Sequence, residues 1–417
     1  MFLFFINHVI ISQLLEWTEK RGLLRLSNRE YAKCIDLVRK SRGVEAAEKY
    51  FTDLPNSAKN KSTYGALLHC FCCEEMTEKA MMLFGKMKEL NFPINSFDYC
   101  SLMSLHLRLG QLEKVPLLHE EIKQKGIKPH LFHYKLLINS YASLKDVKSV
   151  EGVMEEIKMI KGITPDWAFY SNVAAIYVAA GYHEKAELTL KEIEISKLND
   201  PKAFHFLLSI YASMGKVEEV NRVWQSLKSA FPKTSNLSYL TMLQTLSRLE
   251  YMGGLKRCFD EWELHCSSYD IRLANVLIKA YLKRNMTEEA NSLLSHLLEK
   301  RYELNFRTYA LFTEFYLMTH SMDLALKFMG LGTPYLRKSE REMYKKKVHE
   351  FLKYFEEERD VCGAKELCNI LKQVDFLDLE VYASLLCNNI PFERKERQAP
   401  QIMRGNGVEI ISESETT

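Results

Sequence analysis

The chain has 417 residues, of which 47% are hydrophobic and 27% charged, and its formal net charge is +3. This length exceeds one ordinary compact core, so we expect two or three domains or an extended array. The hydrophobic content excludes a chain that is disordered throughout, and only 17 Gly and 10 Pro favour helices over a β-rich fold. A net charge this small neither marks nor excludes a nucleic-acid-binding protein.

The N-terminus reads MFLFFINHVIIS, and this apolar run is too short to cross a bilayer. It also lacks the features of a signal peptide or an organelle transit peptide. Helical sequence, QLLEWTEKRG, follows at once. We interpret residues 1–27 as an N-terminal helical remnant, and we expect the true start to lie upstream with a transit peptide ahead of it.

Three columns of residues then recur in phase, at spacings of 33 to 36 residues. The first column holds large residues: Val38, Phe71, His106, Tyr141, Tyr177, Tyr211, Leu246, Tyr281 and Tyr316. The second holds mostly small ones: Ala47, Ala80, Val115, Val150, Ala186, Val220, Leu255, Ala290 and Ala325. A third follows four residues later, from Phe51 to Met329. A period near 35 residues is typical of solenoids of helix pairs, so we predict an all-α fold of about 9–10 antiparallel helix pairs.

Each repeat can be read as two helices and a turn. In residues 271–305, apolar side chains recur at helical spacing from Leu273 to Tyr281 and again from Ala290 to Leu298. The segment RNMTEEA between them predicts a turn, with Thr287 as cap of the second helix. Repeats closing on GIKP or GITP predict a helix end with Gly just past it. One pair cannot bury both apolar faces, so neighbours must stack.

We delimit the array at residues 28–378. Its repeats are 28–60, 61–95, 96–130, 131–166, 167–200, 201–235, 236–270, 271–305, 306–344 and 345–378. Residues 379–392 begin a repeat that is not completed, and the polar residues 393–417 are expected to be a disordered tail.

The pattern resembles the pentatricopeptide repeat, and in particular plant organellar members that carry only such repeats. The resemblance rests on the period, on a Tyr near the start of many repeats (STYGALL, FDYCSLM, FHYKLLI, AFYSNVA) and on the closing GIKP. It covers about 350 of the 417 residues. It implies a right-handed superhelical solenoid that reads one RNA base per repeat with two or three side chains.

The sequence does not predict a catalytic motif or a metal-binding motif. HEEIK and HEFLK begin like a zinc-protease helix, but Lys123 or Lys353 occupies the second ligand position. The ten cysteines include the cluster HCFCC at residues 69–73, without a partner pair at zinc spacing, so we interpret them as core or surface thiols in a reducing compartment. We therefore predict no enzyme, no cofactor, no metal site and no small-molecule substrate.

The resemblance also implies candidate base-reading residues: the fifth residue of each repeat with the last residue of the same repeat. Ser171 with Asp200 resembles the family's guanine pair, and Asn275 with Asn305 its cytosine pair; Lys135 with Asp166 is a further candidate. The other pairs are Ala32 with Asn60, Gly65 with Asn95, Cys100 with His130, His205 with Ser235, and Leu240 with Asp270. Six of eight pairs depart from the usual pairings, which argues against strong sequence-specific readout.

The thirteenth residue of several repeats is basic: Lys40, Arg108, Arg248 and Lys283. These residues are candidates for contact with the RNA backbone phosphates. An alternative stays open, because a cation near a helix C-terminus is favourable with the helix dipole alone.

Two functions remain in competition. The first is an organellar single-stranded RNA-binding adaptor for the stability, processing or translation of a transcript. The second is a structural scaffold that contacts protein or ribosomal RNA, for example within the mitochondrial ribosome. Neither involves a membrane. The resemblance implies a mitochondrial location, with the plastid as the alternative.

Overall fold

A computed structural model describes residues 26–195, 198–372 and 374. Within these ranges the chain is helical and contains no strand, so the predicted all-α fold is confirmed. Contacts between helices divide the chain into two bodies, an N-terminal body (residues 1–234) and a C-terminal body (residues 235–417). The predicted remnant up to residue 25, the incomplete repeat 379–392 and the tail 393–417 lie outside the described residues.

The N-terminal body contains six helix pairs among its described residues. They are α2 (Asn28–Arg42) with α3 (Val44–Asp53), α4 (Lys61–Cys73) with α5 (Thr77–Glu89), α6 (Ser96–Arg108) with α7 (Lys114–Gln124), α8 (Leu131–Ser143) with α9 (Val147–Met159), α10 (Trp167–Ala179) with α11 (His183–Ile195), and α12 (Pro201–Ser213) with α13 (Val217–Ala230). The short 3-10 helix η1 (Asn56–Ala58) follows α3. From α2 to α10, the first helix of each pair packs against its own second helix and against the first helix of the next pair, and α12 packs against α13.

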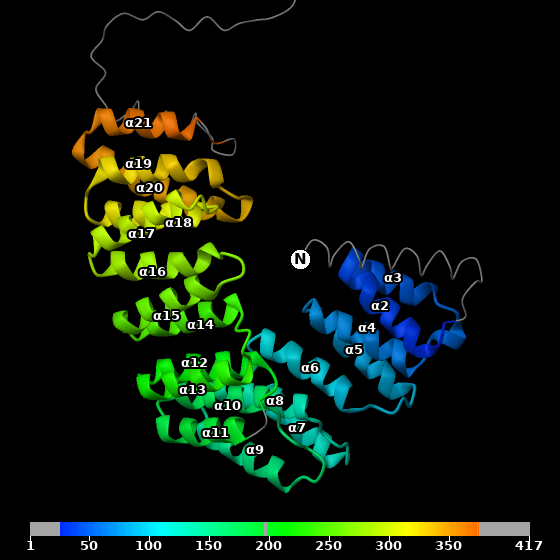
Figure 1. Cartoon of the computed structure of the whole chain (residues 1–417). Helices are drawn as coiled ribbons and strands as arrows, with labels where there is room; N and C mark the ends of the chain where they lie inside the picture. The colour runs from blue at the N-terminus through cyan, green and yellow to red at the C-terminus, as the bar shows by residue number, and fades with distance from the viewer. Residues whose placement is uncertain (1–25, 196–197, 373, 375–417) are drawn as a thin grey trace, which may run out of the picture. The chain divides into compact units, whose positions relative to one another are not determined.

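The C-terminal body repeats this pattern, with successive helix pairs stacked on one another (Figure 1). Its pairs are α14 (Asn236–Arg248) with α15 (Met252–His265), α16 (Ile271–Lys283) with α17 (Thr287–Glu299), α18 (Phe306–Met318) with α19 (Met322–Gly332), and α20 (Arg341–Glu358) with α21 (Val361–Leu371). Two 3-10 helices, η2 (Thr333–Tyr335) and η3 (Lys338–Glu340), separate α19 from α20.

The helix α20 begins four residues before the repeat that the sequence delimits at 345. The side chain of Glu340 accepts the backbone N–H of Arg337 at 3.1 Å, which closes the turn η3 directly ahead of the helix. A helical start can therefore form at Arg341, in a segment where the repeat pattern is disturbed.

The second column of the repeats is buried inside the pairs. All nine of its residues, from Ala47 to Ala325, have no exposed surface. Large residues of the first column, such as Tyr177 and Tyr211, are also buried. A small residue on the second helix lets it approach the first closely, and the larger side chains fill the space beside it.

In the eight pairs from α4–α5 to α18–α19, the turn inside the pair depends on one residue with positive φ, at the fifteenth position of the repeat. Gly110, Gly181 and Gly215 occupy it in three repeats, while Glu75, Lys145, Glu250, Asn285 and His320 occupy it in five others. The next residue then donates its N–H to the carbonyl of the first-column residue, as in Met76 to Phe71 at 3.0 Å. This is the Schellman ending of a helix. The predicted role of Gly in GIKP is confirmed, since Gly126 has a φ of 65°.

The predicted cap of the second helix in residues 271–305 is wrong. Thr287 is the first residue of α17, and Met286 stands at the cap position without a side-chain hydrogen bond. The Schellman turn brings the chain directly into the second helix, so no capping side chain is required there.

Candidate nucleic-acid interface

The last residue of most repeats caps the first helix of the repeat that follows. The residues Asn60, Asn95, His130, Asp166, Asp200, Ser235, Asp270 and Asn305 all accept a backbone N–H from the first turn of that helix. Asn, Asp and Ser are the preferred residues at this position. Helix capping therefore explains the identity of the last residue in each candidate base-reading pair. Sequence analysis could have predicted this capping role, because these polar residues stand directly before apolar helices.

Capping and ligand binding are compatible at Asp166 and Asp200. Asp166 accepts the N–H of Phe169 through Oδ1 at 2.8 Å, and Asp200 accepts that of Lys202 through Oδ1 at 2.9 Å. A carboxylate has a second oxygen with its own lone pairs. Each of these side chains can thus hold its helix and still accept a donor from a base.

The fifth residues of two repeats carry buried polar atoms without a partner. Ser171 is 6% exposed and Asn275 is 8% exposed. The hydroxyl oxygen of Ser171 and Oδ1 of Asn275 are two of only six buried side-chain polar atoms that have no hydrogen bond within the described residues. A buried polar atom is normally paired, because an unpaired one costs about 1–3 kcal/mol. A bound ligand would supply the missing bonds.

The structure brings one predicted pair into contact. Nδ2 of Asn275 donates to Oδ1 of Asn305 at 3.4 Å, so both amides lie at one position between α16 and α18. Ser171 and Asp200 share no hydrogen bond within the described residues. Lys135 is half-buried on α8, and within the same residues it shares no hydrogen bond with Asp166.

A groove in the C-terminal body joins four of the predicted residues. It has a volume of about 660 Å³ and runs between α14, α16 and α18. Asn275, Asn305, Arg248 and Lys283 all line it. Arg272, Lys279 and Arg307 line it too, so five basic side chains surround the two asparagine amides. Such a combination fits a polyanion that also offers hydrogen-bonding groups.

The four candidate phosphate residues differ in their surroundings. Lys283 is 68% exposed and pairs with Glu250 at 2.6 Å, and Lys40 pairs with Asp36 at 2.6 Å. Exposed pairs of this kind are weak and exchange readily for a phosphate. Arg108 is different, because its guanidinium donates to the carbonyls of Cys72 and Cys73 at the end of α4. The structural alternative, a cation at a helix C-terminus, therefore describes Arg108 well.

Sequence analysis missed the second residue of each first helix. Phe97 is 66% exposed and Phe132 is 51% exposed, and the ring of His130 lies 4.2 Å from that of Phe97. Exposed aromatic rings are surfaces on which bases stack. Arg272 and Arg307 occupy the same position in the C-terminal body and line the groove. The sequence could have indicated these residues, because each is a large side chain three positions before the fifth residue. This spacing places both side chains on one face of the helix.

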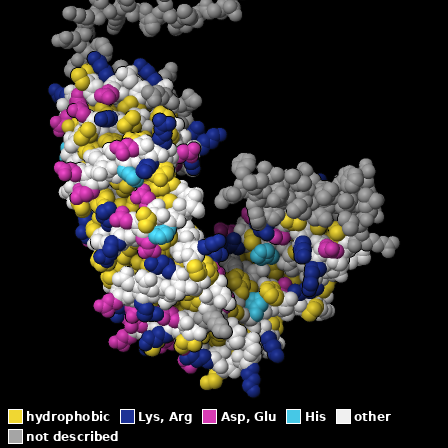
Figure 2. Space-filling model, viewed as in Figure 1, with side chains coloured by type: hydrophobic (Ala, Val, Ile, Leu, Met, Phe, Trp, Pro, Cys, Tyr) yellow, Lys and Arg dark blue, Asp and Glu magenta, His cyan; other side chains and the backbone are white. Residues whose placement is uncertain are grey.

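The charge of the surface is mixed. Lys and Arg side chains are interspersed with Asp and Glu over the face shown in Figure 2. Any affinity for nucleic acid therefore depends on local groupings such as the groove. Across the described ranges, no group of three or more His, Cys, Asp or Glu has the arrangement of a metal site. In the same ranges, every helix is too short or too polar to cross a bilayer.

Comparison with known proteins decides the family. The model of the PPR repeat matches residues 62–92 and 273–302, and that of the pentatricopeptide repeat domain matches residues 82–144 and 117–180. A mitochondrial pentatricopeptide repeat-containing protein of Arabidopsis thaliana is 39% identical over 406 residues, covering 96% of this chain and 75% of the relative. The chain belongs to the pentatricopeptide repeat family.

Two further similarities bear on function. A large ribosomal subunit protein of Arabidopsis thaliana is 39% identical over 384 residues, covering 90% of this chain and 77% of that protein. The crystal structure of the pentatricopeptide repeat protein PPR10 from maize matches with a TM-score of 0.61 at 19% identity. This match covers 82% of the chain but 47% of PPR10, so it shows the fold alone. PPR10 has also been solved in complex with an 18-nucleotide psaJ RNA element.

Proposed function

We propose that this pentatricopeptide repeat protein binds single-stranded RNA without catalysing a reaction on it. It would act in mitochondria as an adaptor for the stability, processing or translation of a transcript. The observation that carries the proposal is the groove of the C-terminal body, where five basic side chains surround Asn275 and its unpaired Oδ1. The mitochondrial location is supported by the relatives' names.

The groove offers two kinds of contact to a single strand. Basic side chains on successive first helices follow a phosphate backbone, and those of Arg272 and Lys283 are 59% and 68% exposed. The amides of Asn275 and Asn305 face the space between them and can bond a base edge, since each amide offers donors and an acceptor. Measuring RNA affinity at several salt concentrations separates these two contributions, because the salt dependence reports the phosphate contacts.

The test is the triple variant Arg248→Ala/Lys279→Ala/Lys283→Ala. We expect it to weaken binding of random single-stranded RNA and to reduce the slope of log affinity against log salt by about 2, at about 0.7 per phosphate contact. The matched control is Lys158→Ala/Lys256→Ala/Lys300→Ala, which removes three exposed lysines from outside the groove. An unchanged slope in the first variant, with a native circular dichroism spectrum, would refute the groove as an RNA site.

A second candidate function is that of a mitochondrial ribosomal component. The similarity to a large ribosomal subunit protein over 90% of the chain favours it. Sedimentation of mitochondrial extracts distinguishes the two functions. A ribosomal component stays with the large subunit after washing at high salt, whereas an adaptor sediments with its transcript and is released by ribonuclease.

A further inference from the structure

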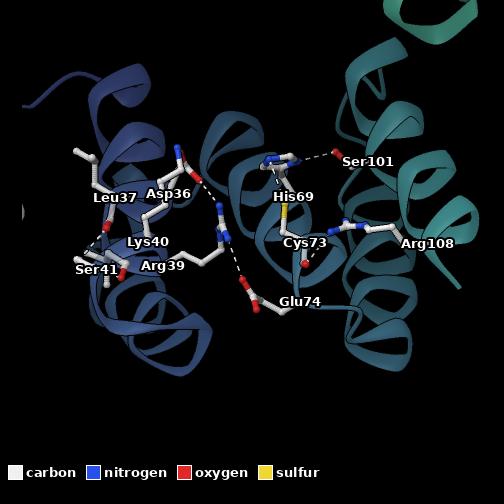
Figure 3. Close-up of polar contacts among 11 residues, drawn as sticks. Asp36, Leu37, Arg39, Lys40, Ser41, His69, Cys73, Glu74, Ser101 and Arg108 are labelled. Atoms are coloured by element: carbon white, nitrogen blue, oxygen red, sulfur yellow. Dashed lines mark hydrogen bonds and ion pairs between the residues drawn. The ribbon is translucent and has the colours of Figure 1, made fainter. Parts of the chain in front are cut away.

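A cysteine–histidine pair lies at the C-terminal end of α4. The Sγ atom of Cys73 is 3.4 Å from Nε2 of His69, which stands one helical turn earlier. On the other side of the imidazole, Nδ1 of His69 is 3.4 Å from the hydroxyl of Ser101 on α6 (Figure 3). The serine therefore holds the ring in place, and the ring can exchange a proton with the thiol.

Two arginines flank this pair, one from each neighbouring first helix. Arg39 of α2 is fixed by Glu74 at 2.8 Å and by Asp36 at 3.1 Å. Arg108 of α6 donates to the carbonyl oxygen of Cys73 itself at 2.8 Å. Figure 3 shows Cys73 between the two guanidinium groups. Lys40 pairs with Asp36 at 2.6 Å at the edge of this cluster.

These surroundings favour the thiolate. The hydrogen bond with His69 lowers the pKa of Cys73, and the charges of His69, Arg39 and Arg108 add to this effect against partial burial. A thiolate is the reactive form of cysteine toward disulfides.

The neighbouring thiols provide a contrast within the same helix. Cys70 and Cys72 are 0% and 1% exposed, and burial raises the pKa of each thiol to about 12. Cys73 is half-buried and so within reach of a small molecule. Of the three thiols in this helical turn, only Cys73 combines access with a basic partner.

We propose that Cys73 is a site of reversible S-thiolation, at which a small disulfide such as glutathione disulfide forms a mixed disulfide with the protein. The Cys73 thiolate attacks one sulfur of the disulfide, a new S–S bond forms and the original S–S bond breaks. The Cys73 sulfur is oxidised, and the departing glutathione thiolate is reduced and takes up a proton from the His69 imidazolium. Reduced glutathione reverses the step.

The modification would change the charge of the candidate interface. Cys73 occupies the thirteenth position of its repeat, between Lys40 and Arg108 of the neighbouring repeats. Glutathione adds two carboxylates and one ammonium group there, which repel a phosphate backbone. This consequence rests on the proposed RNA binding, whereas the thiol chemistry does not.

The experiment treats the full chain with glutathione disulfide at pH 7 and follows each cysteine by peptide mass spectrometry. We expect Cys73 to react at least about tenfold faster than Cys362, which is exposed but has no basic partner of this kind, while Cys70 and Cys72 stay unmodified. In His69→Gln we expect the rate at Cys73 to fall about tenfold at pH 7 and to recover as the pH is raised toward 9. A purely structural role of His69 would lower the rate equally at both pH values.

Two outcomes would overturn the proposal: equal rates at Cys73 and Cys362, or an unchanged rate–pH profile in His69→Gln. RNA binding is then measured before and after thiolation, with Cys73→Ser as the control that glutathione disulfide cannot modify at this position. If the unmodified protein does not bind RNA, the proposed function is contradicted. Selective thiolation of Cys73 in the same sample would still support the thiolation site.

Discussion

At the scale of single residues, the polar atoms that lack partners are the most informative. Asn275 uses Nδ2 on Asn305 and leaves Oδ1 unpaired, and Ser171 leaves its hydroxyl unpaired. Both stand at the fifth position of their repeats, where the family resemblance places base contacts. Burial of an unpaired acceptor is unfavourable in the free protein. RNA binding would relieve that cost, which links stability to affinity at these residues.

Asn275→Ser should change base preference and leave the salt dependence alone. The shorter side chain makes room for a purine, so preference at this repeat should move from cytosine toward adenine, as the family's pairing implies. Selection from a pool of random RNA measures the change, with Ser171 and Asp200 predicting a guanine three positions upstream. An altered salt slope would indicate instead that Asn275 acts on the phosphate backbone.

A pair of buried histidines should make the stability depend on pH. Nδ1 of His119 is 2.8 Å from Nε2 of His133, and Glu156 lies 3.6 Å from His119. Burial lowers the pKa of His133 to about 3, with His119 and His130 adding to the effect. In the unfolded chain the pKa is about 6.5, so the unfolded state binds a proton between pH 6.5 and about 3 while the folded state does not.

Stability is therefore full above about pH 6.5 and falls as the pH is lowered. For His133 alone the loss between pH 7.5 and pH 5 is about 2 kcal/mol. Denaturant unfolding of the parent and of His133→Gln at the two pH values tests this. The variant should lose less stability on acidification, and parallel losses in both proteins would contradict the prediction.

At the scale of helices and turns, the left-handed residue at position fifteen decides how each pair folds back. Glu75 has a φ of 59° and Gly110 a φ of 69° in equivalent turns. A side chain at positive φ is strained by about 1–2 kcal/mol, whereas glycine is not. The five non-glycine turns persist because the packing of the two helices and the Schellman bond favour the same conformation.

The equivalent turns allow a matched test. Glu75→Gly should raise the free energy of unfolding by roughly 0.5–1 kcal/mol, because relief of strain exceeds the extra freedom of glycine in the unfolded chain. Gly110→Ala should lower it by about 1 kcal/mol. No atom lies within 4 Å of the added Cβ at Gly110, so only backbone strain is introduced. Thermal or denaturant unfolding measures both changes, and effects of the same sign would contradict the argument.

At the scale of the whole molecule, each pair contacts the pairs beside it in the chain within its own body. Ala186 is a suitable position to test this arrangement, because it is fully buried in the second column of its repeat. Ala186→Trp should overfill the space between α10 and α11 at a cost of roughly 1–3 kcal/mol or more. Because repeats act mainly on their neighbours, the loss should remain within residues 132–235.

Hydrogen exchange with peptide resolution checks this locality. Faster exchange confined to the repeats around α10 and α11 is the expected result. Uniform acceleration from residue 28 to residue 378 would show that the array unfolds as one cooperative unit.

The sequence by itself determined the helix pairs and their order. The three columns and their period follow from helical geometry, because residues three and four apart share a face and each pair must bury its face on a neighbour. Capping by Asp166 or Asn305 was also readable locally, because a polar residue stands directly before an apolar helical segment. These features depend on short stretches of chain, so a single sequence contains them.

Only the tertiary structure decided which side chains meet across repeats. The contact of Asn275 with Asn305 and that of Arg108 with Cys72 and Cys73 join residues 30 to 36 positions apart. The groove gathers its five basic residues from three first helices. Their distances depend on how far each pair is rotated and shifted against the next, which packing over many side chains sets. The tertiary structure also decided the five turns without glycine, because only packing of the two helices of the pair holds these residues in the left-handed conformation.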